Sequence, residues 1–251
     1  MAELDRRYEQ TVGRAEAGAL DQGLRAYMLR VYNYMASGVA ITGVVAYAIY
    51  AMSVVTGADG AITGLTAFGN VMFASAFKWV VIFAPLAMVF FISFRINKMS
   101  LGTAQTAFWA FSALMGASIA SIFLVYTGES MARVFFITAA AFGALSLWGY
   151  TTKKDISGWG SFLFMGLIGV IIASLVNLFI GSTALQFAVS VIGVLVFAGL
   201  TAYDTQQIKE MYSANDDGTL SGRKAVMGAL RLYLDFINLF LLLLQLFGDR
   251  R

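Results

Sequence analysis

Long apolar stretches alternate with short polar ones along most of the chain. Seven stretches come close to the roughly 20 mostly apolar residues that a helix needs to cross a bilayer. They lie at about residues 31–55, 72–94, 103–126, 132–150, 161–180, 185–203 and 230–247. Runs such as FLLLLQLF show no strand-like alternation, and lipid leaves open backbone groups unsatisfied. The pattern therefore predicts an all-α integral membrane protein with seven transmembrane helices.

Composition supports this prediction and excludes several kinds of chemistry. Of the 251 residues, 59% are hydrophobic and 12% are charged, whereas soluble domains carry roughly 25% charged residues. The net charge of +3 is scattered among loops, which is not the pattern of a nucleic-acid binder. The sequence contains no cysteine and no histidine, which excludes disulfides, thiol catalysis, serine–histidine hydrolases and zincins. We expect no enzymatic activity, no catalytic residue and no bound cofactor.

The chain divides into one membrane domain and two polar ends. The first 24 residues are polar, and no apolar stretch follows Arg6-Arg7 closely enough for a signal peptide. We predict a polar cytoplasmic segment at 1–27, a seven-span membrane domain at 28–248, and a short tail at 249–251. The absence of a targeting segment favours a bacterial inner membrane.

Basic residues in the loops predict the orientation. Lys and Arg are concentrated before the first span and in the loops that follow the second, fourth and sixth spans, whereas 56–71, 127–131 and 181–184 contain none. Cytoplasmic loops are enriched in these residues, so the N-terminus is predicted to be cytoplasmic. Arg250-Arg251 breaks the pattern, because a seventh full span would place it outside. We nevertheless interpret the seventh span as a full crossing.

Two aspartates lie where charge is costly. Asp204 ends the sixth span in GLTAYDTQQIK, and Asp235 lies inside the seventh, in RLYLDF. The two spans run in opposite directions, so both acids should reach a similar depth near the cytoplasmic face. Charged residues within spans are rare and usually functional. If the spans pack together, the carboxyl groups would share protons, because two close carboxylates cannot both ionise cheaply.

Arginines at the same depth offer a structural alternative. Arg231 lies one helical turn before Asp235, and Arg95 ends the second span, so ion pairs could neutralise both acids. We favour a functional pair, because two acids inside a membrane are hard to explain by folding alone. Carboxylates suit a hard cation such as calcium, although two of them make a weak site, better suited to passage than to storage. The candidate accessory oxygen donors are Tyr203, Tyr233 and Asn238.

These segments also resemble a known family. AYDTQQIK (202–209) followed by LYLDFINLFLLLLQLFG (232–248) resembles the signature of the Bax inhibitor, or transmembrane Bax inhibitor motif, family in its bacterial YccA- or YetJ-like branch. The resemblance extends from about residue 25 to residue 248. It implies a seven-helix bundle in which the seventh helix is central and the other six surround it.

The resemblance implies a function as well. The family's paired acids match Asp204 and Asp235, and they are thought to form a proton-sensitive latch for a calcium leak. The family's arginine at the end of the second span matches Arg95, which would pair with Asp204 in the closed form. One departure is that residues 81–88 contain no acid, where a member of the family has one. We therefore expect a pH-sensitive calcium leak, with calcium as the transported or weakly bound ion and membrane lipid as a partner.

Two other functions deserve comparison. The YccA branch is associated with modulation of the membrane protease FtsH, so a non-conducting regulator that binds such a protease through its N-terminal segment is the main alternative. An aspartyl intramembrane protease of the presenilin type also carries Tyr-Asp on its sixth span. However, its seventh-span Gly-x-Gly-Asp is replaced here by YLDF, and its Pro-Ala-Leu element is missing, because Pro85 is the only proline.

Overall fold

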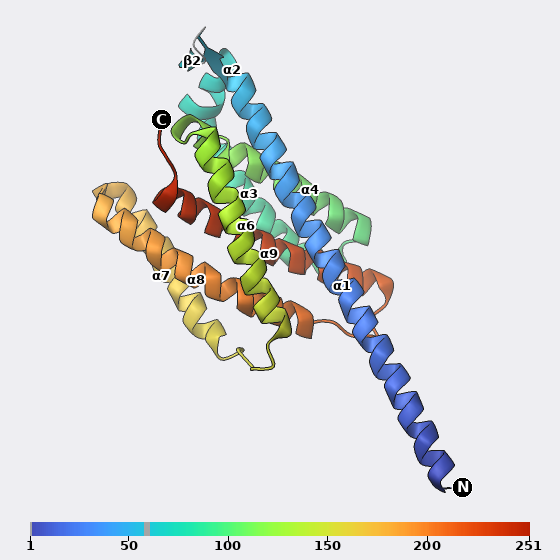
Figure 1. The fold of residues 1–251 in the computed structure, drawn as a ribbon. Helices are drawn as coiled ribbons and strands as arrows, with labels where there is room; N and C mark the ends of the chain where they lie inside the picture. Colours follow the sequence, from blue (N-terminus) through green and yellow to red (C-terminus); the bar gives the residue numbers. More distant parts are fainter. Residues whose placement is uncertain (1, 58–60) are drawn as a thin grey trace.

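The structure is a computed structural model that describes residues 2–57 and 61–251, with side chains described from residue 22 onward. Long helices dominate it (Figure 1). The long helices are α1 (Ala2–Ser53), α3 (Phe77–Arg95), α4 (Leu101–Ile119), α6 (Gly128–Thr151), α7 (Trp159–Ile180), α8 (Thr183–Glu210) and α9 (Gly218–Phe247). The short elements are β1 (Val54–Thr56), β2 (Ile62–Leu65), α2 (Ala67–Gly69), η1 (Asn70–Ala74), η2 (Ile96–Lys98) and α5 (Ile122–Val125).

The seven predicted spans correspond to seven helices that are long and apolar enough to cross a membrane in the described part of the chain. The predicted all-α, multi-pass architecture is therefore confirmed. The largest differences in extent are at the polar ends of the helices. α8 continues to Glu210 and α9 begins at Gly218, because polar residues extend a helix beyond the lipid as readily as apolar ones do.

Local capping explains where several helices begin. Ser100, Thr127, Ser182 and Asp217 precede α4, α6, α8 and α9, and the side chain of each accepts a hydrogen bond from a backbone N–H in the first turn. These residue types are preferred at this position because their oxygen satisfies an otherwise free donor. α7 ends at Gly181, which adopts a left-handed conformation with φ of 65°, a common helix terminator.

The polar N-terminal segment is continuous with the first span. α1 runs without interruption from Ala2 to Ser53, so no break in backbone structure marks the predicted boundary at residue 27. Ala, Glu, Gln and Arg are common in this segment and are good helix formers. Figure 1 shows the N-terminal part of α1 projecting beyond the other helices.

Burial differs sharply between the helices. In the apolar 18-residue stretch of α9, 72% of the residues are buried, compared with 11% in the corresponding stretch of α7 and 17% in that of α3. α9 packs against α1, α4, α6 and α8, whereas α3 packs chiefly against α4 and α7 chiefly against α8. The six other helices therefore do not contact α9 equally. α3 and α7 form an outer layer, and the faces of these two helices that do not pack against a neighbour are apolar and exposed.

The C-terminal tail is attached to the end of the bundle opposite the N-terminus (Figure 1). The backbone N–H groups of Thr127 and Arg251 donate to the carbonyls of Asp249 and Val125. The Arg133 guanidinium forms an ion pair with Asp249 at 2.8 Å. The tail after α9 is thus held against the end of α5 and the start of α6.

The first loop contains structure that the sequence pattern did not predict. β1 and β2 form an antiparallel hairpin, followed by α2 and the π-helical turn η1. Thr66 connects this region to α1, because its backbone N–H donates to Ser53 O and its hydroxyl donates to Met52 O. The hairpin is too short for hydrophobic periodicity to reveal it.

Close approach of α6 and α8 depends on Gly149. A Cβ at this position would lie 2.3 Å from the carbonyl oxygen of Ala202, whereas a Cβ at Gly143, on the same helix, would meet nothing within 4 Å. Backbone atoms cannot move aside as a flexible side chain can. Small residues at such crossings let helices in lipid pack closely.

We therefore predict that Gly149→Ala destabilises the protein by about 1–3 kcal/mol through overpacking. Gly143→Ala is the matched control, and we expect it to be neutral or stabilising by up to about 1 kcal/mol, since alanine is the better helix former. The measurement is the free energy of unfolding in detergent micelles. Equal effects of the two substitutions would contradict the proposed contact.

Candidate functional site

The structure brings the two predicted aspartates together. Asp204 lies near the C-terminal end of α8 and Asp235 lies in the N-terminal half of α9, and these antiparallel helices pack against each other. The two carboxyl groups are within hydrogen-bonding reach. The similar depth that the sequence predicted for them is thus what allows the contact.

The two acids differ in their surroundings. Asp235 is 4% exposed, and its Oδ2 atom is buried without a hydrogen-bond donor among the described residues. The Asp204 side chain is 17% exposed. Burying a carboxylate without a donor is costly, and two adjacent carboxylates repel each other. A proton shared between the two acids removes both penalties, because the protonated carboxyl then donates to the other.

Among the described basic residues, Arg231 is the one that forms an ion pair with Asp204. Its Nη1 atom lies 4.0 Å from Asp204 Oδ1, at the limit of an ion pair, and its side chain is 42% exposed. Contact with water and the long distance both weaken the attraction. Arg231 therefore compensates only part of the charge on Asp204, and no ion pair to Asp235 is found among the described residues.

Arg95 does not take the position that the resemblance implied. It is exposed at the C-terminal end of α3 and forms no ion pair in the described part of the structure. The reason is the packing: α3 lies chiefly against α4, while Asp204 is on α8. The arginine that pairs with Asp204 in this structure is Arg231.

The predicted accessory oxygen donors point elsewhere. The Tyr203 phenol packs against Gly160 of α7. The Tyr233 hydroxyl bonds to Thr42 Oγ1 of α1 at 2.6 Å, and its ring is buried against Phe108 and Phe111 of α4. The side chain of Asn238 donates to Leu234 O, one turn earlier in its own helix. None of these contacts is with the aspartate pair.

Two polar clusters within the spans were not predicted. In one, Thr42 connects Tyr233 to the carbonyls of Gly38 and Ser112. In the other, Tyr32 of α1 bonds to Ser146 of α6 at 2.6 Å, and Ser146 bonds to Thr205 of α8 at 2.9 Å. Hydroxyl residues in apolar spans are a weak signal, because each can also bond to its own helix. Thr205 adjoins Asp204, so the second cluster fixes the α8 backbone beside the acid pair.

The chemistry available at the aspartates is proton exchange and weak cation binding. Among the described residues, no group of three or more His, Cys, Asp or Glu side chains could hold a metal ion. Calcium takes six to eight oxygen ligands in proteins, so two carboxyl groups alone cannot bind it tightly. Neither of the two described cavities includes Asp204 or Asp235, and the pair lies within the packed helices.

Comparisons with known proteins agree with this architecture. The model of the family described as "Inhibitor of apoptosis-promoting Bax1" matches residues 24–251. The chain is 48% identical to the inner membrane protein YbhL of Escherichia coli, over 91% of this chain and 94% of that protein.

Two uncharacterised relatives align with a similar or larger share of the chain. A protein of Rickettsia prowazekii is 46% identical over 92% of each chain. A protein of Caulobacter vibrioides is 44% identical over the full length of both. The family match includes α8, α9 and both aspartates. The chain therefore belongs to the Bax inhibitor family of membrane proteins.

Proposed function

We propose that this protein is a pH-sensitive calcium leak of the inner membrane, with a cytoplasmic N-terminus and the Asp204–Asp235 pair as its proton-sensitive latch. The observation that carries the proposal is the contact between two carboxyl groups, one of which is buried with an oxygen that has no donor among the described residues. Such a contact is stable when a proton is shared and unstable when both groups ionise. The pair is therefore suited to sensing protons.

The proposed mechanism acts at the contact between α8 and α9. At intermediate pH the shared proton holds the two helices together. At higher pH both carboxyl groups ionise, and their repulsion favours separation of the helix ends and entry of calcium between them. At lower pH both groups are protonated and bind calcium poorly. The direction of the pH effect follows from the charge, because loss of protons favours the open form. A change of a few kcal/mol in the free-energy difference between the closed and open forms is enough to shift the population.

Calcium is proposed as the ion because the pair offers hard oxygen ligands. Two carboxyl groups provide a weak site from which an ion can leave, which conduction requires. The absence of an acid in residues 81–88 means that α3 contributes no carboxylate from this stretch. The path would consequently depend on α8 and α9.

We expect calcium influx into liposomes, measured from about pH 5 to 8, to vary with pH, because a coupled pair of carboxyl groups exchanges its protons as a unit. Asp204→Asn and Asp235→Asn should each flatten this dependence, because an amide neither ionises nor repels its neighbour. The measurement is the initial rate of fluorescence increase of an internal calcium dye after addition of external calcium.

Asp155→Asn is the matched control. Asp155 is an exposed acid in the loop between α6 and α7, and hydrogen bonds from Ser157 lower its pKa. This variant removes the same charge away from the pair and should keep the wild-type pH profile. Flux no greater than that of protein-free liposomes at every pH would refute conduction. A wild-type profile in both latch variants would refute the latch.

A second candidate function, a non-conducting regulator of a membrane protease such as FtsH, is favoured by one observation. The N-terminal part of α1 projects beyond the bundle as a continuous helix (Figure 1), and the family match begins only at residue 24. The backbone of this segment lies beyond the other helices, as contact with a separate protein would require.

Deleting residues 2–21 separates the two functions. If the regulator function holds, the deletion should abolish co-purification of the protease from membranes and restore normal turnover of its substrates. Calcium flux should remain unchanged, because the deleted residues precede the first span. Retention of the protease by the shortened chain would count against this candidate.

The role of Tyr233 can be tested independently. Tyr233→Phe removes the hydrogen bond to Thr42 and should destabilise the protein by about 0.5–1.5 kcal/mol, the usual range for such a bond. Because the hydroxyl faces Thr42, we expect the pH profile of calcium flux to be unchanged. Unfolding and flux measured on the same preparation would check this. An altered profile with normal stability would restore Tyr233 as an oxygen donor to the ion.

A further inference from the structure

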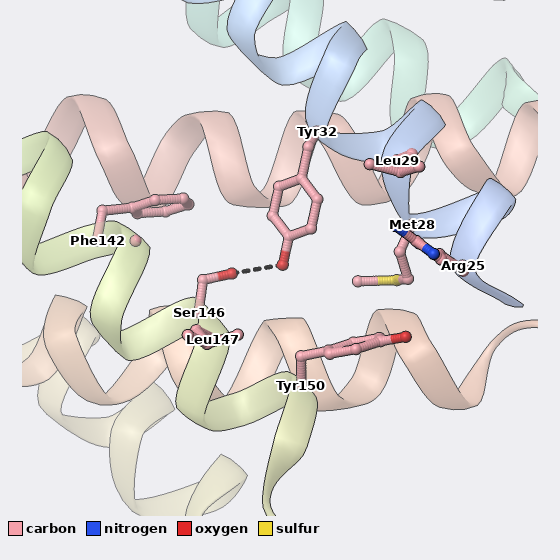
Figure 2. Close-up of a pocket in the computed structure, with 9 residues that line it drawn as sticks. Arg25, Met28, Leu29, Tyr32, Phe142, Ser146, Leu147 and Tyr150 are labelled. Carbon is pink, nitrogen blue, oxygen red and sulfur yellow. Dashed lines mark hydrogen bonds between the residues drawn. The ribbon is translucent and has the colours of Figure 1, made fainter.

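A cavity of about 590 Å³ lies between α1 and α6, apart from the aspartate pair (Figure 2). Its lining comes from residues 25–32 of α1 and 142–150 of α6. At 1.5 Å per helical residue, the cavity extends about 10–12 Å along the helices. Its volume falls within the range of small-molecule sites. Because both helices are membrane spans, its contents must be compatible with the bilayer.

The cavity opens toward the side of the bundle that faces lipid. Leu29 and Leu147 lie at its edges and are 52% and 62% exposed. Met28 and Phe142 form buried apolar walls. The lining surface is overwhelmingly apolar, so a hydrocarbon chain can enter laterally without crossing water.

The inner end of the cavity carries polar groups that are already paired. Figure 2 shows the Tyr32 hydroxyl and the Ser146 hydroxyl directed toward each other, and they lie 2.6 Å apart. Ser146 is bonded in turn to Thr205. Because these hydroxyl groups already have partners, they do not require a polar ligand. The part of an occupant that reaches this depth is therefore expected to be apolar.

The end of the cavity at Arg25 is charged, in contrast to the apolar walls. Arg25 lines it, is exposed, and forms no ion pair in the described part of the structure. Lys209 lies close by, where it donates to Tyr150 O and sits 5.4 Å from the Tyr150 ring centroid. No acid is among the described lining residues. An anionic head group at this end would therefore gain a partner without meeting a competing charge.

We propose that this cavity binds an anionic phospholipid, with one acyl chain between α1 and α6 and the phosphate at Arg25. The arrangement matches the two ends of such a lipid: apolar walls in the span, and at the end of the span a guanidinium that forms no ion pair with the described residues. Guanidinium groups bind phosphate oxygens through two parallel hydrogen bonds. This inference does not depend on ion conduction.

The test is native mass spectrometry of the full-length protein in detergent with an equal mixture of phosphatidylglycerol and phosphatidylcholine that carry identical acyl chains. The wild-type protein should retain phosphatidylglycerol preferentially. Gly143→Leu should reduce retention about tenfold or more, because the new side chain fills the cavity. A Cβ at Gly143 meets no atom within 4 Å, so the fold should tolerate the change. The matched control is Gly169→Leu, since Gly169 is an equally unobstructed glycine on the exposed surface of α7.

Arg25→Gln tests the head-group contact on an exposed side chain, so its result does not depend on how Gly143→Leu folds. It should lower the preference for phosphatidylglycerol about fivefold, as expected for one basic residue near an anionic membrane surface. The control is Arg30→Gln, which removes an exposed arginine of α1 that does not line the cavity. Unchanged retention in Gly143→Leu would overturn the site. Equal retention of the two lipids by the wild-type protein would overturn its selectivity for an anion.

Discussion

The packing of α9 is the constraint on which the rest of the structure depends, because this helix carries a carboxyl group into the interior. Most of the residues in the apolar 18-residue stretch of α9 are buried, and Asp235 is nearly inaccessible to solvent. A buried acid needs either a donor or a proton. The described surroundings of Asp235 Oδ2 contain no donor, and in the proposed latch a proton shared with Asp204 supplies the neutrality. In that proposal, the stability of the α8–α9 contact is linked to protonation.

Close contacts between small residues hold the neighbouring helices in place around this pair. Gly149 allows α6 to touch the backbone of α8 at Ala202, and Ser146, one turn earlier in α6, then reaches Thr205. Thr205 follows Asp204 directly in the chain. The α1–α6 cavity shares Ser146 with this cluster, so whatever occupies the cavity touches a helix that positions one of the two acids.

Hydropathy could predict the spans and their number, because these follow from lipid solvation. A contact between Asp204 and Asp235 was predicted only on the condition that the two antiparallel helices pack together, which hydropathy does not specify. The orientation of individual side chains could not be predicted. Tyr203, Tyr233 and Asn238 are close to the acids in sequence, but each side chain contacts a different helix or its own backbone. The partner of Asp204 was similarly undetermined, since either Arg95 or Arg231 had the right depth, and only helix packing distinguishes them.

The unequal surroundings of the two acids bear on how a latch would release. Asp204 has partial access to water and a distant arginine, which together offset part of the cost of its charge. Asp235 is nearly inaccessible, and no ion pair to it is found in the described structure, so in the proposed latch the shared proton should stay with Asp235 until the surroundings of α9 change. Ionisation of Asp235 is therefore tied to entry of water or a cation between α8 and α9. In the proposed latch, proton loss and opening are two aspects of a single transition, and a cation that enters meets two carboxylates, too few to retain it.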